Sequence, residues 1–394
     1  MAREAAAPET NMAAAVDIEK GKPQLVEPDL ELIKELAHFG ADTFSKCYQC
    51  ATCSVSCSLS PDENPFPRKE MLWAKWGLKD RLLSDVDIWT CYYCGDCSTR
   101  CPRKAEPGET MMALRRYLTS QYDWTGISRL LYTSRLREIG AVVGLGLLVV
   151  VVFALSGAFT PERMPSDHVS VGTFAPVGWV HIFDLLMAGV LTFFLLTNTY
   201  RMWRMVMRGV KAPLSAYLSG LINFAVNAAT QKRWRDCEQE DNSRWLKHFI
   251  FVPAYVAMFT LVMVFLEDLQ VDTSEFTAVS ILGYVIASIL LYVSGDAILS
   301  RLRKMEEIHK HSHDSDWMFL ILLFFTSLTG IMMHFFRIAD WALPTYYMYV
   351  IHMAFVVPLL VLEVPFMKWA HLMYRPLALY LKEVKESAAA TKAA

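Results

Sequence analysis

The chain has 394 residues, of which 54% are hydrophobic and 20% charged, and its formal net charge is −2 at pH 7. A mean hydropathy of +0.27 is high for a soluble protein and indicates a membrane part. The near-neutral charge provides no general attraction to nucleic acid, so no nucleic-acid partner is expected.

Residues 1–28 are rich in Ala, Glu and Pro and carry no apolar signal segment, so we expect a disordered lead-in. Residues 29–125 are predicted to form a soluble, helical domain. The stretches LELIKELAHFG, FPRKEMLWAKWGLKDRLL and GETMMALRRYL all have apolar residues at helical spacing, and the first ends in glycine.

Eight of the nine cysteines lie in two groups with the same C-x2-C-x2-C-x3-C spacing, at residues 47–57 and 91–101. This is the spacing of bacterial ferredoxins, in which three close thiolates bind one [4Fe–4S] cluster and the fourth binds the other cluster. Carried over to this chain, the pattern predicts two clusters. Their ligands would be Cys47, Cys50, Cys53 and Cys101 for the first, and Cys91, Cys94, Cys97 and Cys57 for the second.

Structural zinc is the alternative, but zinc sites usually combine separated C-x2-C pairs rather than three cysteines at steps of three. Cys101 precedes Pro102, whereas Cys57 precedes SLSP, so the loop after Cys57 could differ. Cys237 stands alone and is predicted to be inert or to pack in a helix. Reduced, metal-binding thiols place the cysteine domain in the cytoplasm.

Six apolar runs have the length that crosses a bilayer, and they define a membrane domain at 126–380 with a tail at 381–394. The predicted spans are 139–159, 177–199, 248–266, 276–298, 317–336 and 346–367. Segments on one side carry 23 Lys and Arg residues and those on the other carry two, which predicts an inner-membrane protein with both termini in the cytoplasm. Residues 201–247 are predicted to form interfacial helices, with a cytoplasmic helical hairpin as the alternative.

Five histidines fall at two depths of the predicted bundle. They are His248 and His371 at the cytoplasmic end, and His181, His334 and His352 towards the opposite end. Any one could be an interfacial residue, but histidines on different helices at two depths are what two stacked, bis-histidine b haems require. His352 and His371 are about 100° out of phase on an ideal helix, and Pro358 and Pro365 between them could change that phase.

Two parts of the chain resemble known families. The helical sequence between the cysteine groups resembles the ferredoxin domain of the iron–sulfur C subunit of heterodisulfide reductase and of succinate dehydrogenase iron–sulfur subunits. The stretch YMYVIHMAFVVPLLVLEVPFMKWAHLMYRPLALYL resembles the last helix of the respiratory nitrate reductase gamma subunit family, which provides one ligand to each of two b haems. That resemblance implies that His248 and His371 bind the inner haem and that His352 binds the outer one. The family's fourth ligand falls on Met258, so His181, His334 or Met258 would complete the outer haem.

From about residue 30 the chain resembles the iron–sulfur (C) and cytochrome b (E) subunits of heterodisulfide reductase fused together. This arrangement is characteristic of the fused membrane subunit of the quinone-interacting membrane-bound oxidoreductases of sulfate reducers. The resemblance implies menaquinol oxidation near the outer haem. It also implies two flavin-containing partners resembling the heterodisulfide reductase flavoprotein (its A subunit), and adenylylsulfate reductase as the downstream acceptor. Asp184, Arg337 and Asp340 are candidate quinone-site residues, and Glu363 is a candidate for proton handling.

The chain has no G-x-G-x-x-G or Walker motif, so we expect a quinone-linked oxidoreductase subunit that is active only within a complex. Three alternatives remain open. They are a membrane subunit of a heterodisulfide reductase or sulfite-reduction complex, a haem-free membrane anchor, and a histidine-relay transporter with a regulatory iron–sulfur domain.

Overall fold

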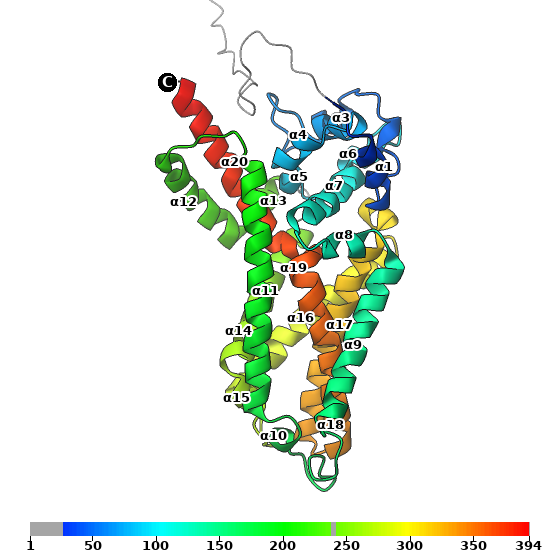
Figure 1. Cartoon of the computed structure of the whole chain (residues 1–394), viewed down its shortest axis with the longest axis vertical. Helices are drawn as coiled ribbons and strands as arrows, with labels where there is room; N and C mark the ends of the chain where they lie inside the picture. Colours follow the sequence, from blue (N-terminus) through cyan, green and yellow to red (C-terminus); the bar gives the residue numbers. More distant parts are fainter. Residues whose placement is uncertain (1–26, 238–241, 394) are drawn as a thin grey trace, which may run out of the picture. The chain divides into compact units, whose positions relative to one another are not determined.

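The computed structural model describes residues 27–237 and 242–393, and within these ranges every regular element is a helix (Figure 1). The all-α prediction is therefore confirmed. The helices form two compact units. Unit 1 contains the described parts of residues 1–118, 200–238 and 373–394, and unit 2 contains residues 119–199 and the described part of 239–372. The predicted lead-in lies almost wholly outside the described residues.

Unit 1 begins with α1 (Leu30–His38), whose N-terminus is capped by the Asp29 carboxylate accepting a 2.9 Å hydrogen bond from the Leu32 N–H. The predicted helix after Phe66 is divided into α3 (Arg68–Lys75) and α4 (Lys79–Ser84). Gly77 lies between them at φ +65°, where a Cβ would come within 2.5 Å of the Asp29 carbonyl oxygen. Glycine is therefore required there by both the backbone angle and the close approach.

Short helices surround the cysteine groups, and a longer one follows them. They are η1 (Phe44–Lys46), α2 (Thr52–Val55), α5 (Asp87–Thr90), α6 (Asp96–Thr99) and α7 (Pro107–Tyr122). Large buried side chains, among them Leu36, Phe39, Trp89 and Tyr117, form the unit's core.

Two later segments, the described parts of residues 200–238 and 373–394, belong to unit 1, whereas residues 242–247 belong to unit 2. The described part of residues 201–247, predicted to be interfacial, forms the end of α11 (Val177–Val206), then α12 (Leu214–Thr230) and α13 (Lys232–Cys237), and α14 begins at Ser243. Leu214, Leu218 and Ile222 make an exposed apolar stripe on α12, a composition that suits the predicted interface. The predicted tail continues helix α20 (His371–Ala393), whose Leu381 and Val384 are buried.

Unit 2 contains the helices that are long and apolar enough to cross a membrane, six of them among the described residues. They are α9 (Arg135–Leu155), the first part of α11, α14 (Ser243–Val264), α16 (Ala278–Leu302), α17 (Asp314–Ile338) and the segment Ala342–Phe366. Each overlaps a predicted span, although α9 begins and ends about one turn earlier than predicted. Shorter helices lie between them: α8 (Ile127–Tyr132), α10 (Val171–Phe174), α15 (Leu266–Leu269) and η2 (Glu307–His311).

The long helices of unit 2 pack in the order α14, α16, α17, α18 (Ala342–Pro358) and α9, as the neighbouring ribbons in Figure 1 show. Their outward surfaces keep many exposed leucine, valine and phenylalanine side chains, because the solvent for these faces is expected to be lipid.

The sixth span is not one regular helix. After α18 the chain makes a π-helical segment, η3 (Leu359–Glu363), then α19 (Val364–Phe366), a break at Met367 and a 3₁₀ turn, η4 (Lys368–Ala370). Pro358 ends α18, which is consistent with proline disrupting the hydrogen-bond ladder of a helix. The phase of an ideal helix therefore does not apply between His352 and His371. The 100° difference is then no argument against both of them being haem ligands.

Candidate iron–sulfur and haem sites

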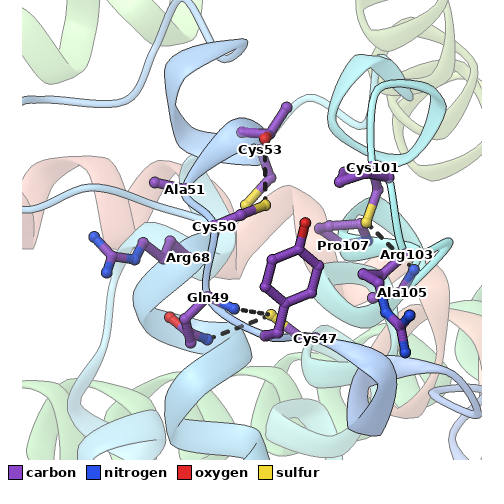
Figure 2. Close-up of a pocket in the computed structure, with 13 residues that line it drawn as sticks. Cys47, Gln49, Cys50, Ala51, Cys53, Arg68, Cys101, Arg103, Ala105 and Pro107 are labelled. Carbon is purple, nitrogen blue, oxygen red and sulfur yellow. Dashed lines mark hydrogen bonds between the residues drawn. The ribbon is translucent and has the colours of Figure 1, made fainter.

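The first predicted cysteine set lines a single pocket in unit 1. Figure 2 shows Cys47, Cys50 and Cys53 from the first group, with Cys101 from the second group across the pocket. Backbone N–H groups point at two of these sulfurs: Gln49 N–H donates to Cys47 Sγ and Ala105 N–H donates to Cys101 Sγ, both at 3.4 Å. Four convergent sulfurs with N–H donors suit an iron–sulfur cluster, whose potential responds to hydrogen bonds to its sulfurs.

The pKa of the Cys53 thiol shows how closely the cysteines of the first set are packed. Burial raises the pKa of the Cys53 thiol to about 11, and the neighbouring Cys47, Cys101 and Cys50 contribute to this increase. Thiols this crowded repel one another when ionised, so a bound metal cluster that neutralises their charge would stabilise the arrangement.

The second predicted set, Cys57, Cys91, Cys94 and Cys97, also gathers in unit 1. Burial raises the pKa of Cys57 to about 11, with Cys91 and Cys94 as its charged neighbours. Burial also raises the pKa of Cys97, and Cys91, Cys94, Cys53 and Cys57 are its charged neighbours. The fourth cysteine of each group thus lies near cysteines of the other group, and the assignment of the eight cysteines to two clusters stays a prediction.

The two cysteine groups fold alike. Gln49 and Tyr93, each two residues after the first cysteine of its group, have positive φ, as do Ala51 and Gly95 just before α2 and α6. Tyr93 N–H donates to Cys91 Sγ at 3.3 Å, as Gln49 does to Cys47.

The loops that leave the two groups also close in the same way. The Ser60 N–H donates a hydrogen bond to the Cys57 carbonyl, and the Lys104 N–H donates one to the Cys101 carbonyl, both at 3.1 Å. Ser58 stands where the second group has Pro102, and this turn is the same in both loops.

Two guanidinium groups lie beside the second set. Arg115 and Arg375 both donate to the Cys91 carbonyl oxygen, Arg375 at 3.1 Å. Arg375 also lies 3.6 Å from the centre of the Tyr92 ring. Positive charge next to a cluster site favours the reduced, more negative state of a cluster.

Cys237 is close to the second set, which the sequence did not indicate. Its side chain hydrogen-bonds to Cys94, and Cys91 and Cys57 are further charged neighbours, so that its pKa is raised. Helix α13 is held there by a Ser58 hydroxyl that donates to the Asp236 carbonyl at 3.0 Å and by Trp234, whose ring lies 5.2 Å from that of Tyr92. Since Cys94 and Cys237 are 143 positions apart in the sequence, only tertiary structure could bring them together.

The inner histidine pair is brought together in unit 2. The ring centres of His248 and His371 are 6.4 Å apart, with 52° between their planes. Metal–imidazole nitrogen bonds are about 2.0–2.1 Å long, so two axial imidazoles on opposite sides of one metal have ring centres roughly 6 Å apart. His371 Nδ1 is bonded to the Lys368 carbonyl at 2.5 Å, which leaves Nε2 for a metal, as is usual for histidine ligands. These residues therefore fit a bis-histidine haem.

The outer histidines are not gathered in the same way. His352 Nδ1 bonds to Thr329 Oγ1 at 2.9 Å, and its ring packs against Gly330. His334 has both ring nitrogens engaged, Nδ1 with the Tyr284 hydroxyl at 2.9 Å and Nε2 with Arg337 at 2.6 Å. Among the described residues no second histidine ring contacts that of His352.

The other candidates for the outer site have different surroundings. His181 is half-buried on α11, one turn before Asp184, and Met258 packs against apolar side chains of α14 and α16. Neither side chain is held away from a metal by a hydrogen bond in the described contacts.

Of the candidate quinone residues, Arg337 and Asp340 lie one turn apart at the end of α17, whereas Asp184 is on α11. Arg337 is buried and donates to the Leu269 carbonyl oxygen. Asp340 accepts a hydrogen bond from the Val169 N–H at 2.8 Å, which anchors a loop, and Asp184 is buried on α11. Glu363 is 1% exposed and lies at the end of the π-helical segment, a type of irregularity that is frequent at functional sites.

Comparison with known proteins identifies the cysteine region. Residues 43–105 match the family described as the 4Fe-4S dicluster domain. A protein of Archaeoglobus profundus that is named as similar to the C subunit of heterodisulfide reductase is 35% identical over 105 residues, which are 26% of this chain and 54% of that protein. The second iron–sulfur C subunit of the CoB–CoM heterodisulfide reductase of Methanocaldococcus jannaschii is 38% identical over 98 residues, or 25% of this chain and 46% of that one.

A third relative is the C subunit of an H(2):CoB-CoM heterodisulfide,ferredoxin reductase from Methanothermobacter marburgensis. It is 37% identical over 79 residues, covering 20% of this chain and 42% of the relative. The chain thus spans about half the length of these curated relatives. No solved structure matches the chain.

Residues 43–105 therefore form an iron–sulfur, electron-transfer domain for two [4Fe–4S] clusters, related to the C subunit of heterodisulfide reductase. The relatives are subunits of oxidoreductases, and here this domain is followed by helices long enough to span a membrane.

Proposed function

We propose that this protein is a membrane subunit that carries electrons between a quinone pool and cytoplasmic flavin and iron–sulfur partners, through two b haems and two [4Fe–4S] clusters. The observation that carries the membrane half of this proposal is the His248–His371 pair, with ring centres 6.4 Å apart and His371 oriented by the Lys368 carbonyl. Bound b haem would supply one-electron transfer within the membrane.

The chain's own residues would hold and tune these groups. Cys47, Cys50, Cys53 and Cys101 would bind one cluster, and Cys57, Cys91, Cys94 and Cys97 the other. His248 and His371 would bind the inner haem. Helix α20 begins at His371 and carries Arg375 one turn later, so an inner ligand and the arginine that contacts the Cys91 carbonyl lie on one helix.

For the outer haem we propose His352 with His181. The Thr329 hydroxyl orients His352 through Nδ1 and leaves Nε2 available. His334 is the poorer partner because ligation would break its bond to Arg337 and leave a buried guanidinium with one acceptor fewer.

The substrate is proposed to be a quinol, by resemblance menaquinol. Its oxidation releases two protons and two electrons, and the electrons would pass singly to ferric haem. Lys and Arg residues are concentrated on the side of the cysteine domain, which favours termini in the cytoplasm and a quinol site towards the opposite face of an inner membrane. The partners would be two flavoproteins like that of heterodisulfide reductase, and adenylylsulfate reductase the final acceptor, as in the quinone-interacting oxidoreductase of sulfate reducers.

The test is a reduced-minus-oxidised visible spectrum of the purified protein and its variants. We expect a b-type signal from about two haems per chain, falling by about half in both His248→Ala and His371→Ala. His168→Ala is the matched control, because that histidine lies in an exposed loop and should keep both haems. Preparations that contain iron–sulfur clusters but no haem would refute the proposal in favour of an anchor.

A second candidate is a membrane subunit of a heterodisulfide reductase, favoured by the names of the relatives. Both candidates use the same internal electron carriers and differ in their soluble partners. Identification of the subunits that co-purify with the native complex separates them: adenylylsulfate reductase supports the first, and a disulfide-reducing subunit supports the second.

A further inference from the structure

A chain of hydrogen bonds links three polar side chains within the membrane helices of unit 2. Arg337 on α17 donates to the Leu269 carbonyl through Nη1, and its Nη2 lies 2.6 Å from His334 Nε2. His334 Nδ1 lies 2.9 Å from the hydroxyl of Tyr284 on α16. Polar groups at such positions are costly in a membrane and usually have a function.

The donor and acceptor in each of these hydrogen bonds follow from the chemistry of Arg337. A guanidinium only donates hydrogen bonds, so His334 Nε2 must be the acceptor and the neutral ring carries its proton on Nδ1. Nδ1–H then donates to the Tyr284 oxygen. The Tyr284 hydroxyl is the last group in this series of hydrogen bonds, and the described contacts provide no acceptor for its hydrogen.

Two hydrogen-bond donors in this group have no acceptor among the described residues, the Tyr284 hydroxyl and Arg337 Nε. Arg337 is only 5% exposed, and its Nε has no hydrogen-bond partner among the described residues. Asp272 is a charged neighbour, but no described carboxylate forms an ion pair with the guanidinium. A buried donor without an acceptor is costly, because it has lost its hydrogen bond to water. A structural tie between α16 and α17 would account for the hydrogen bonds that are present but not for the unpaired hydrogen of the Tyr284 hydroxyl.

The surroundings suit a flat aromatic ligand that arrives from lipid. Tyr284 and His334 are half-buried, and the Phe276 ring, which is 60% exposed, lies 6.2 Å from the His334 ring and 6.0 Å from that of Tyr284. Aromatic faces at these separations can pack against a planar ring, while the hydroxyl contacts a polar atom at its edge.

We propose that Phe276, Tyr284, His334 and Arg337 form a binding site for a quinone head group, in which the Tyr284 hydroxyl donates to a quinone carbonyl oxygen. The choice of ligand class rests on the proposed function. Arg337 and His334 are positioning residues, because they act through Tyr284 by directing its hydrogen outwards. His334 is then not a haem ligand.

The binding test uses the full-length protein in detergent and a fluorescent heptyl hydroxyquinoline N-oxide, a quinone analogue, competed by a short-chain naphthoquinone. Tyr284→Phe removes the donor and keeps the ring, so we expect naphthoquinone affinity to fall several-fold, up to about tenfold. Tyr292→Phe is the matched control, an exposed tyrosine two turns along the same helix, and should bind as the wild type does.

A second measurement separates this site from the haem sites. His334→Gln should keep the full b-haem spectrum while it weakens naphthoquinone binding. Unchanged affinity in Tyr284→Phe, or loss of a haem in His334→Gln, would overturn the inference. Wild-type protein that lacks haem but shows Tyr284-dependent quinone binding would refute the proposed electron path and leave this site standing.

Discussion

At the scale of single residues, Cys237 brings a fifth thiol to the second cysteine set, one more than a [4Fe–4S] cluster binds. A [4Fe–4S] cluster takes four thiolates, and Cys57, Cys91, Cys94 and Cys97 already provide them. Cys237 contacts Cys94 most closely, which fits a thiol that hydrogen-bonds to a ligand sulfur rather than one that binds iron. Such a donor outside the ligand shell is expected to tune the cluster.

We predict that Cys237→Ala retains about eight irons per chain, whereas Cys57→Ala falls to about four. With the donor beside Cys94 removed, the midpoint potential of one cluster should become lower and that of the other should not change. Iron and sulfide analysis with an electron paramagnetic resonance titration measures both quantities. A four-iron Cys237→Ala protein would instead make Cys237 the fourth ligand in place of Cys57.

At the scale of elements, the approach of α17 to α18 positions the proposed outer ligand. Gly330 on α17 faces the His352 ring, and a Cβ there would lie 3.2 Å from His352 Cε1. Glycine lets the ring lie against the neighbouring backbone, close enough for Thr329 to hold Nδ1. The π-helical segment and the break at Met367 then redirect the chain before His371, so that His352 and His371 can serve two different sites.

We expect Gly330→Ala to displace His352 and to lower the b-haem absorbance by up to about half, because one of two haems is affected. Gly144→Ala on α9 is the matched control, since a Cβ there meets nothing within 4 Å. That change should leave the spectrum intact, and it replaces a poor helix former with a better one. The b-haem absorbance of the two variants is compared in the visible spectrum. Equal spectra for both variants would contradict the placement of His352.

At the scale of the whole chain, unit 1 is assembled from three separated segments, two of which are joined by a buried ionic network. The Lys69 ammonium lies 3.0 Å from both Glu70 and Asp85 and in closer contact with Asp87, which also pairs with Lys382 of α20 at 2.7 Å. The three carboxylates come within 4.8 Å of one another, and the Lys69 ammonium occupies the position among them that a metal ion would need.

The network should make the stability of unit 1 depend on pH. Burial, and then the Asp85 and Asp87 carboxylates, raise the pKa of Glu70 well above its usual value, although Lys69 opposes this. The folded state therefore holds a proton that the unfolded chain releases at about pH 4.3, and the stability is lost as the pH rises towards the folded pKa, by up to about 1.4 kcal/mol per pH unit.

Glu70→Gln should remove this loss of stability at high pH. The thermal midpoint of the variant is therefore expected to exceed that of the wild type by an amount that grows from about pH 5 to pH 8. Glu31→Gln, at an exposed site on α1, is the control and should show no such trend. Thermal unfolding followed by circular dichroism measures the difference. A Gln variant that is less stable than the wild type at about pH 8 would show that the Lys69–Glu70 ion pair outweighs the cost of burial.

The sequence by itself determined the helical class, the six apolar spans and the presence of a domain for two [4Fe–4S] clusters, because these depend on local periodicity and on a cysteine spacing that is typical of such clusters. It also indicated His248 and His371 through a resemblance. Tertiary structure alone decided that Cys237 lies against Cys94, that the C-terminal residues pack in unit 1, and that His334 bonds to Tyr284 and Arg337. Each of these depends on contacts between residues far apart in the chain or on side-chain geometry within the folded bundle, and such contacts leave no periodic signal in the sequence.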